Sequence, residues 1–373
     1  MPFVDGHIEW DSSIPLDTDA SRDPRIVAIQ QYMDQNNIEF DGIWTLSEMC
    51  VVLTSQIASY FWKKCIHQDV IAQLKNKKSA RKWLFKNHSE LKIDCSHVCS
   101  SRDFRIEDIQ KEDFPLIAKG AEGYWKNCVK IVDSFDSLKE TLAQNPTISF
   151  VVESYFEWTD IDLNLIVQNG RIVWSWFVEN FAPRQPWFLE NGSQTCVCIN
   201  EEEQEEVIRY VQNIITLTPW IQSACLHVEF RVAHKGTDFS FTLIEINFRL
   251  WGGENFVFHL GQDTHDLILS NLELAFDMPV SQTTRKNGYY KYIKTADLYV
   301  NKAGVLRVLE WPKTKDGIMQ YVFFAEPGSQ YEFPPRWWLV DDIWWIVAGS
   351  HTSPEEASIM LEKALQEVIV DIQ

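Results

Sequence analysis

The chain has 373 residues, 45% of them apolar, and 16 tryptophans, so it can bury a substantial core in two or three domains. Its formal net charge of −19 argues against nonspecific binding to nucleic acid or to an anionic membrane surface. The longest apolar runs are too short to span a bilayer, and the first residues lack the pattern of a secretory signal. Because the eight cysteines include no Cys-x-x-Cys pair, we expect reduced thiols in a cytoplasmic protein.

The N-terminal part of the sequence predicts helices around a short strand. Apolar residues recur at helical spacing over residues 25–36 and 49–62, and residues 40–45 between them predict a strand. A further, basic helix is expected to begin within residues 76–84. Its cations either form a solvated face or include a contact for phosphate. This order indicates an α/β arrangement.

The middle of the chain predicts a compact α+β unit with antiparallel strands. We expect a helix at residues 136–143 and strands at residues 114–120, 128–132, 148–153, 162–167 and 171–174. The dipeptide Asn169-Gly170 between the last two strands is a hairpin signal, because both residue types tolerate positive φ.

Three further elements are expected in the C-terminal half. The acidic run at residues 201–206 opens a helix and opposes the positive end of its dipole, so we interpret it as a solvated helix start and not as a metal site. Residues 304–311 predict a strand. Ser353, Pro354 and Glu356 suit the N-cap, N1 and N3 positions of another helix.

Two short runs with alternating side chains carry the main candidate site. Alternation places Glu245 and Asn247 on one face of their strand together with Leu243. In the preceding run, it places Glu229 on the face opposite to its apolar neighbours. Residues 234–238 predict a hairpin loop that would bring the three polar side chains together. Clustered carboxylate and amide oxygens suit Mg2+, which usually bridges to substrate phosphates. The alternative is a strand pair with a solvated acidic face.

The order of these features, together with one longer motif, resembles the ATP-grasp superfamily. The pattern Glu-x-Asn-x-Arg-x-x-Gly-Gly is shared by its carboxylate–amine ligases and stands here at residues 245–253. Within the superfamily, the chain looks closest to the L-amino acid ligases and the carnosine-synthase-like group, from about residue 40 to the C-terminus. Residues 346–350 and 353–357 also resemble the closing strand and helix of the family.

The resemblance implies a mixed α+β and α/β fold, the ATP-grasp fold, in three parts. These are an abbreviated N-terminal α/β domain at residues 1–85, a small α+β lid at residues 86–156 and a C-terminal antiparallel-sheet domain at residues 157–373. The Mg2+ and substrate sites are expected in the C-terminal part. The first domain is called abbreviated because residues 1–24 supply no clear first strand and Gly-rich turn.

The resemblance also implies ligands for ATP and Mg2+. Glu229, Glu245 and Asn247 match the metal ligands of the family, which would hold two Mg2+ ions, with Mn2+ as an alternative. Lys119 matches the lid lysine that contacts the nucleotide phosphates. Lys77 matches an earlier phosphate lysine.

The nucleotide site has two open assignments. Lys78 is a rival for the phosphate contact given to its neighbour Lys77. Asp160 matches the residue that binds the ribose hydroxyls, and Asp162 is its rival on the same strand face. The hinge that reads the adenine edge is matched by Glu153, Ser154 and Phe156.

The resemblance names catalytic and substrate-binding residues as well. Arg249 and Lys119 match the catalytic cations, and a guanidinium suits an acyl phosphate or tetrahedral intermediate because its donor fork fits phosphate and carboxylate geometry. The substrate site is matched by Arg249, Trp251, Gly252 and Gly253. The two glycines allow close backbone approach to the bound acid.

The activity that the resemblance implies is ATP-dependent ligation of a small carboxylic acid, such as an amino acid, to an amine. The reaction would pass through an acyl phosphate and release ADP and phosphate. We expect small-molecule partners and no nucleic acid or membrane partner; a homodimer is one expectation, because ligases of this fold are often dimers. The alternatives are a non-catalytic ATP-binding regulatory or scaffold module and an ATP-grasp enzyme with another acceptor.

Two features depart from the family pattern. The lid loop at residues 120–127 is usually rich in Gly and Ser, but here it contains Tyr124 and Trp125, which would cover the phosphates differently. Trp251 stands where a small residue is common, so it would narrow the acid pocket or stack on a substrate.

Overall fold

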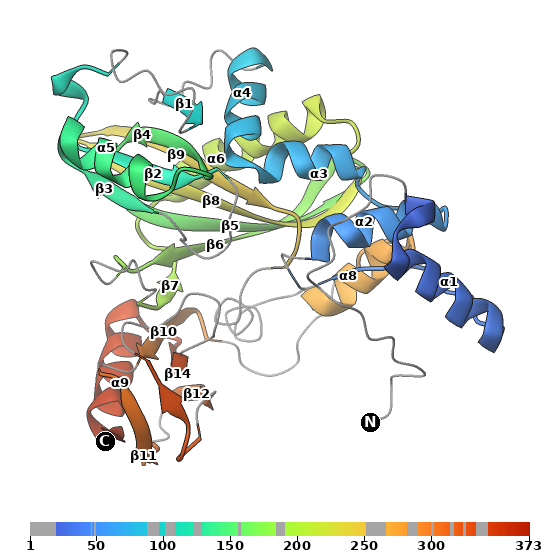
Figure 1. The fold of residues 1–373 in the computed structure, drawn as a ribbon. Helices are drawn as coiled ribbons and strands as arrows, with labels where there is room; N and C mark the ends of the chain where they lie inside the picture. The colour runs from blue at the N-terminus through green and yellow to red at the C-terminus, as the bar shows by residue number, and fades with distance from the viewer. Residues whose placement is uncertain are drawn as a thin grey trace.

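In the residues that it describes, the computed structural model combines helices with three antiparallel sheets (Figure 1). It describes residues 20–45, 47, 50–87, 97–100, 109–121, 129–155, 158–183, 191–250, 266–281, 290–299, 302–313, 317–323, 326–332 and 342–373. The mixed α and β architecture expected from the sequence is confirmed. Among the helices in these ranges, none has both the length and the apolar character needed to cross a bilayer.

Helices make up the N-terminal part of the described chain. They are η1 (Ala20–Arg22), α1 (Pro24–Asn36), α2 (Val51–Tyr60), α3 (Gln68–Lys75) and α4 (Lys77–Asn87). The helices expected from the sequence are confirmed as α1, α2 and α4, whereas the strand expected at residues 40–45 is wrong. Phe40 and Ile43 pack against Ile26 of α1 and Leu53 of α2, so helices bury the apolar side chains of this segment.

A four-stranded sheet, which we call the lid sheet, follows in the order β1-β4-β2-β3. Its elements are β1 (His97–Ser100), η4 (Lys111–Asp113), β2 (Leu116–Gly120), β3 (Lys130–Val132), α5 (Phe135–Gln144) and β4 (Ser149–Ser154). Leu138 of α5 shares a core with Ala118 and Val152, which pair across β2 and β4. Since side chains alternate along a strand, Lys119 and Glu153 point to the opposite face of the lid sheet.

The large sheet has eight strands in the order β12-β14-β10-β7-β6-β5-β8-β9 (Figure 1). They are β5 (Thr159–Gln168), β6 (Arg171–Asn180), β7 (Ser193–Thr195), β8 (Ser223–Lys235), β9 (Asp238–Asn247), β10 (Tyr292–Tyr299), β12 (Ile318–Phe323) and β14 (Asp342–Ser350). Helices α6 (Glu201–Leu217) and α8 (Leu267–Ala275) pack on it. Both expected hairpins are confirmed: Asn169 and Gly170 turn at φ of 54° and 71°, and Gly236 turns at 67°.

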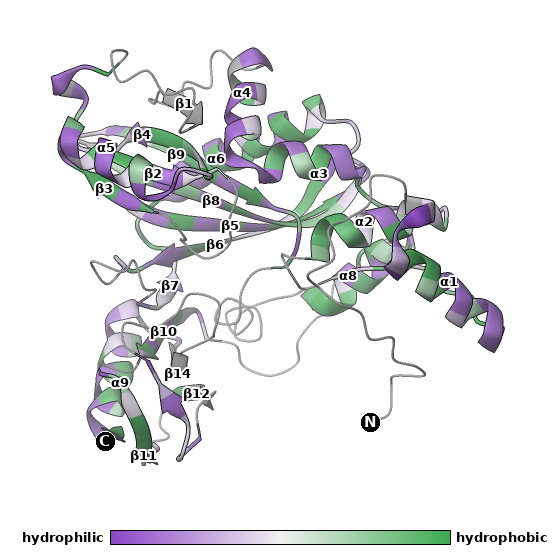
Figure 2. Cartoon of the chain, viewed as in Figure 1, coloured by the Kyte–Doolittle hydropathy of each residue, from purple (hydrophilic) through white to green (hydrophobic). Residues whose placement is uncertain are grey.

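The two faces of β5, β8 and β9 differ in polarity. Leu163, Val228 and Ile246 pair side by side across the three strands and belong to the main core, which α3 and α6 cover. Figure 2 shows that these two helices carry both hydrophilic and hydrophobic residues, as expected for helices with one face on a core. On the other face, Leu267 of α8 packs with Ile166 at one end of the strands. The remaining part of that face carries polar side chains.

A β-bulge interrupts the ladder between β8 and β9. Glu229 pairs with Glu245, whereas the next residue, Phe230, pairs with Leu243, so Ile244 is an extra residue in β9. The bulge changes the direction of the preceding side chains, and Leu243 therefore lies in the main core with Phe230. The expectation that Leu243 shares the face of Glu245 is wrong, while the pairing of the two glutamates is confirmed.

The C-terminal part forms a smaller core at the other end of the large sheet. Its elements are β11 (Gly304–Glu310), β13 (Gln330–Tyr331), α9 (Pro354–Glu367) and β15 (Ile369–Ile372). Leu361 of α9 shares this core with Leu306 of β11 and Ala348 of β14. Ser353 Oγ accepts a hydrogen bond from the backbone N–H of Glu356 at 3.2 Å, which confirms the expected N-cap. The two strands expected here are confirmed as β11 and β14.

Candidate active site

The polar face of the large sheet gathers side chains from three adjacent strands. Asp162 of β5 pairs with Glu229 of β8, and Glu229 pairs with Glu245 of β9. His227 of β8 pairs with Asn247 of β9. Asn247 Nδ2 lies 3.0 Å from Glu245 Oε1 and 3.3 Å from Glu229 Oε1, so the amide bridges the two carboxylates. The structure therefore brings together the three residues predicted as metal ligands.

Lys77 reaches this acidic cluster from the first position of α4. Its backbone N–H donates to the carbonyl of Ala121, just beyond β2, at 3.0 Å. Its ammonium group forms an ion pair with Glu245 Oε2. Burial lowers the pKa of Lys77, but the charges of Glu245 and Glu229 raise it by more. The pKa of Lys77 therefore lies above its ordinary value. This contact favours Lys77 over its neighbour Lys78 as the lysine that faces the site.

Glu245 stays ionised although it is largely buried. Burial raises the pKa of its carboxyl, but the charge and hydrogen bond of Lys77 and the hydrogen bond from Asn247 lower it to about 2. The side chain of Glu245 is 21% exposed, so a small ligand can still reach it. A carboxylate that is charged at neutral pH and lies beside a second carboxylate favours the binding of a cation.

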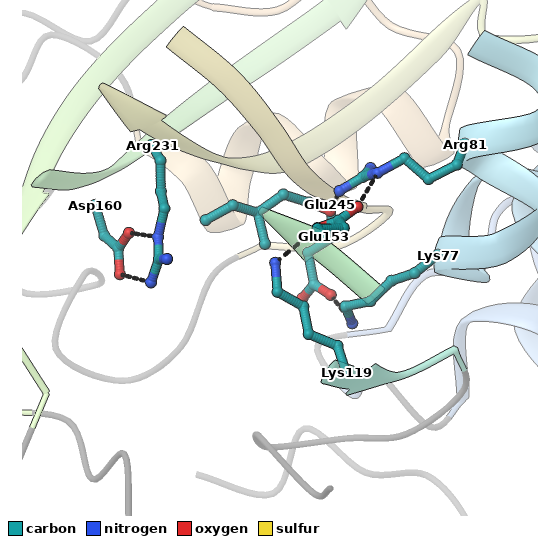
Figure 3. Close-up of polar contacts among 8 residues, drawn as sticks. Lys77, Arg81, Lys119, Glu153, Asp160, Arg231 and Glu245 are labelled. Carbon is teal, nitrogen blue, oxygen red and sulfur yellow. Dashed lines mark hydrogen bonds and ion pairs between the residues drawn. The ribbon is translucent and has the colours of Figure 1, made fainter. Parts of the chain in front are cut away.

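Glu153 forms a second charged centre between β4, β2 and α4 (Figure 3). Arg81 Nε donates to Glu153 Oε1 at 2.7 Å, and Lys119 Nζ donates to Glu153 Oε2 at 3.0 Å. Burial raises the pKa of the Glu153 carboxyl, but the charges of Arg81 and Lys119 outweigh it and hold the pKa well below its usual value. Lys119 is thus fixed by a side chain that the sequence analysis had assigned to the adenine hinge.

Arg81 also connects this centre to the edge of the large sheet. Its Nη2 donates to the carbonyl of Ile244, the bulged residue of β9, at 3.1 Å. Because β9 is the last strand of the sheet, this contact gives a hydrogen-bond partner to a carbonyl at the sheet edge. Lys77 and Arg81 are four residues apart on α4 and therefore lie on the same face of the helix. From this face, Lys77 pairs with Glu245 and Arg81 pairs with Glu153.

Asp160 lies at one end of the polar face and is held by Arg231 of β8. Arg231 Nε donates to Asp160 Oδ1 at 2.6 Å, and Nη2 donates to Oδ2 at 3.4 Å. The same guanidinium lies 5.6 Å from the ring centre of Tyr155, which follows β4. The side chain of Asp160 is 26% exposed, whereas only 5% of Asp162 is exposed and Asp162 accepts a hydrogen bond from Asn180. Asp160 is therefore the more accessible of the two.

Two residues that the sequence analysis did not single out lie beside the acidic pair. His227 Nδ1 is 2.8 Å from Asn164 Oδ1, and His227 Nε2 is 3.5 Å from Glu229 Oε1. Asn164 and His227 are 1% and 5% exposed, so these contacts fix the imidazole behind Glu229. The signal that could have found them is alternation, since Asp162-x-Asn164 and His227-x-Glu229 place polar residues at every second position. Arg231 continues the same series.

Arg249 lies two residues beyond Asn247, after the end of β9. Its Nη1 donates to the carbonyl of Leu250 at 2.8 Å. It also lines a cavity of about 100 Å³ with Ser55 of α2 and Ala224 of β8, and residues of α8 complete the wall. The structure therefore places Arg249 at the junction of the N-terminal helices and the large sheet.

The remaining predicted residues are only partly covered by the structure. Ser154 ends the inner strand β4 and pairs with Leu116, the first residue of β2. Outside the described residues lie the predicted site residues Phe156, Trp251, Gly252 and Gly253, and the loop residues Tyr124 and Trp125.

Sequence comparison detects one distant similarity. No family model matches the chain. Carnosine synthase 1 from Gallus gallus is 22% identical over 196 residues, which are 50% of this chain. The matched region is 20% of that protein, so this chain spans only about a fifth of the length of its curated relative.

Solved structures are similar over nearly the whole chain. The L-amino acid ligase from Bacillus licheniformis has a TM-score of 0.74 at 18% identity and covers 96% of this chain and 86% of its own. Phosphoribosylglycinamide synthetase from Anaerococcus prevotii has a TM-score of 0.63 at 13% identity, with 96% and 88% covered. A β,γ-ATP complex of biotin carboxylase from Campylobacter jejuni has a TM-score of 0.67 at 14% identity, with 93% and 78% covered. The chain has the ATP-grasp fold.

The ATP-grasp fold explains why residues that are distant in sequence meet here. The lid sheet supplies Lys119 and Glu153, and the large sheet supplies Glu229 and Glu245. Helix α4 contacts both sheets, because Lys77 bonds to the end of the lid strand β2 through its backbone and to Glu245 through its side chain. The fold expected from the motif order is confirmed.

Proposed function

We propose that this ATP-grasp chain is an ATP-dependent ligase that joins a small carboxylic acid, such as an amino acid, to an amine. The observation that carries the proposal is the oxygen cluster of Glu229, Glu245 and Asn247 in contact with Lys77. Support comes from the similarity in fold to L-amino acid ligase and in sequence to carnosine synthase 1.

The three-part organisation belongs to the same proposal. Residues 86–156 would be the lid, and the lid sheet falls within this range. Residues 157–373 would be the C-terminal domain with the metal and substrate sites, and they contain the whole large sheet. Residues 1–85 would be the N-terminal domain, whose described part contains η1, α1, α2, α3 and most of α4.

The donor set at the acidic cluster suits a hard divalent cation. Two carboxylates and an amide oxygen are ligands that Mg2+ prefers, and Lys77 already marks a place where positive charge is favoured. A half-turn of the Asn247 amide would present its oxygen to the cation in place of Nδ2. We assign two Mg2+ ions to Glu229, Glu245 and Asn247, with Mn2+ as the alternative; when bound, they would neutralise charge on the nucleotide phosphates.

The charged residues around the cluster would bind the nucleotide. Lys77 and Lys119 would contact the phosphates, and the accessible carboxylate of Asp160 would accept hydrogen bonds from the ribose hydroxyls. The adenine hinge would be formed by Glu153, Ser154 and Phe156. Since Lys77 contacts Glu245 in this structure, nucleotide binding would exchange one internal ion pair for a lysine–phosphate and a carboxylate–cation contact.

The proposed reaction activates the acid before the amine attacks. A carboxylate oxygen of the substrate takes the γ-phosphoryl group of ATP, the amine attacks the acyl carbon, and inorganic phosphate leaves. Arg249, beside its cavity, would bind the carboxylate and the acyl phosphate through its donor fork. Trp251, Gly252 and Gly253 would complete the substrate site. Lys119 would stabilise the negative charge, and the lid would exclude water.

Two alternatives remain distinct from this proposal. The similarity in fold to biotin carboxylase and phosphoribosylglycinamide synthetase supports an enzyme that shares the phosphoryl step but uses another acceptor. A non-catalytic ATP-binding module would keep the fold without turnover. The proposal itself includes a cytoplasmic location and a homodimer, and sedimentation of the purified chain tests the dimer.

The decisive test is phosphate release from ATP and Mg2+ with a panel of amino acids and small carboxylic acids, singly and in pairs. Release that requires both an acid and an amine supports the ligase, and the expected product is an amide detectable by mass spectrometry. Glu245→Gln should lower the release strongly, whereas a change at Glu205, an exposed glutamate of α6, to Gln should not. Release with an acid alone and no amide would favour another acceptor. Mg2+-dependent ATP binding without any turnover would favour the non-catalytic module.

A further inference from the structure

A second cluster of ligand-type side chains lies on the opposite side of the large sheet. Glu179 of β6 pairs with Ile161, which belongs to the main core, so it points to the core face. The next residue, Asn180, donates to Asp162 on the polar face. Cys196 and Cys198 lie in the segment between β7 and α6 and approach Glu179 from that core side. The thickness of the sheet therefore separates this cluster from the candidate active site.

The three side chains are close enough to share one ion. Cys196 Sγ and Cys198 Sγ are 3.8 Å apart, and both lie within 4.8 Å of a carboxylate oxygen of Glu179. In a tetrahedral zinc site with Zn–S bonds of about 2.3 Å, two cysteine sulfurs are ~3.8 Å apart. The two thiols thus already have the separation that a tetrahedral metal requires.

Backbone and side-chain hydrogen bonds hold the carboxylate in place. Glu179 Oε2 accepts from the N–H groups of Val197 and Cys198 at 3.2 and 3.0 Å, and Oε1 accepts from Gln194 Nε2 at 2.9 Å. Each carboxylate oxygen has two lone pairs, so Oε1 keeps one for a metal. The same contacts fix the Cys-Val-Cys segment against β6, and ligand binding would require little rearrangement.

We propose that Cys196 Sγ, Cys198 Sγ and Glu179 Oε1 form a site for one thiophilic divalent cation of the Zn2+ class. The fourth position of the tetrahedron would be taken by water, since Cys198 is half-buried and Val197 is exposed. Soft thiolates select such a cation, whereas the all-oxygen cluster on the polar face selects Mg2+. The two sites would therefore hold different metals at the same time. A bound ion would tie β6 to the segment that enters α6.

Cobalt substitution of the metal-free protein tests the site directly. Co2+ bound by two thiolates gives a ligand-to-metal charge-transfer band in the near ultraviolet. One equivalent of Zn2+ should remove this band, whereas excess Mg2+ should not. Cys198→Ser should abolish the band. Glu179→Gln should weaken Co2+ binding at least ~10-fold, because even outer-shell partners of metal ligands contribute that much. Cys65→Ser, which changes an exposed thiol elsewhere, should leave the titration unchanged.

Thiol chemistry provides an independent readout. Zn2+ should protect the half-buried thiol of Cys198 in the native protein from alkylation, and peptide mass mapping should locate the protected thiol. Circular dichroism of each variant establishes that it is folded before its titration is interpreted. The proposal is overturned if the wild-type protein gives no thiolate–cobalt band, if the band persists in folded Cys198→Ser, or if Zn2+ leaves the reactivity of Cys198 unchanged.

Discussion

The two carboxylate centres beside α4 use the same residue types but balance their charges differently. Glu153 contacts two cations, Arg81 and Lys119, and its side chain is 8% exposed. Glu245 contacts one cation, Lys77, lies beside a second carboxylate, and is 21% exposed. The first centre therefore has an excess of positive charge inside the protein, and the second has an excess of negative charge that a ligand can reach.

This difference shows how helix α4 can contribute to stability through Arg81 and to ligand binding through Lys77. Where a buried carboxylate has two cationic partners, removal of either one takes away a buried charge-assisted hydrogen bond, and the interaction behaves as part of the fold. Where the carboxylates outnumber their cationic partner, an added cation improves the balance. We therefore expect a change at Arg81 to affect mainly unfolding and a change at Glu245 to affect mainly activity.

Arg81→Ala should have the largest effect because Arg81 joins Glu153 to the edge of the large sheet. It removes two buried hydrogen bonds from a charged donor, one to Glu153 and one to the Ile244 carbonyl, so the free energy of unfolding should fall by about 3–5 kcal/mol. Urea unfolding followed by tryptophan fluorescence measures this change. A decrease of less than about 1 kcal/mol, the range of surface pairs, would show that the centre is not structural.

Glu245→Gln should separate activity from stability. Loss of this predicted metal ligand should lower kcat/KM for ATP-dependent phosphate release by about a hundredfold or more, because outer-shell partners alone contribute up to that much. The free energy of unfolding should fall by less than in Arg81→Ala, because Glu229 remains as a counter-charge for Lys77. If this variant loses as much stability as Arg81→Ala, the two centres do not differ as described.

The pH dependence of unfolding should sharpen the comparison at Glu153. The ordinary pKa of this carboxyl is 4.5, and in the folded chain the pKa lies well below that value. The unfolded chain therefore takes up the proton first, so the stabilisation is complete above the ordinary pKa and is lost as the pH falls further. The stability difference between wild type and Glu153→Gln should shrink by up to about 1.4 kcal/mol per pH unit. Urea unfolding between about pH 6 and pH 3 measures it, and a constant difference would contradict the prediction.

Arg209→Ala should have the smallest effect and provides a baseline for both centres. Arg209 and Glu205 form a pair on α6 at 3.9 Å, with side chains 67% and 72% exposed. Solvent screens such a pair, so the free energy of unfolding should change by no more than about 0.5 kcal/mol. The same urea series measures it. A larger change would mean that exposure does not set the scale of these ion pairs.

Local patterns in the sequence were sufficient for much of the fold and for the acidic pair. Alternation placed Glu229 and Glu245 on facing strands, and the positive-φ residues Asn169 and Gly170 predicted the turn between β5 and β6. The order of motifs predicted the ATP-grasp fold. The assigned roles of the site residues remain predictions, which the activity and binding measurements test.

The contacts that position the site could not be read from local patterns. The Arg81–Glu153 pair joins residues 72 positions apart, and its formation depends on how α4 docks between two sheets. No glycine or other special residue marks the bulge at Ile244, so strict alternation gave the wrong face for Leu243. Residues 40–45 have strand-like composition, but the nearby helices offered their side chains a better partner than a sheet.

The extra residue Ile244 shifts the alternation of side chains in β9 by one position. Before it, Phe239 and Leu243 face the core; after it, Ile246 faces the core and Glu245 faces the site. Deletion of Ile244 would restore strict alternation and force one half of the strand to present the wrong side chains. Single substitutions in β9 therefore leave the facing of the other side chains unchanged. An insertion or deletion of one residue would need a second length change in the same strand to restore that facing.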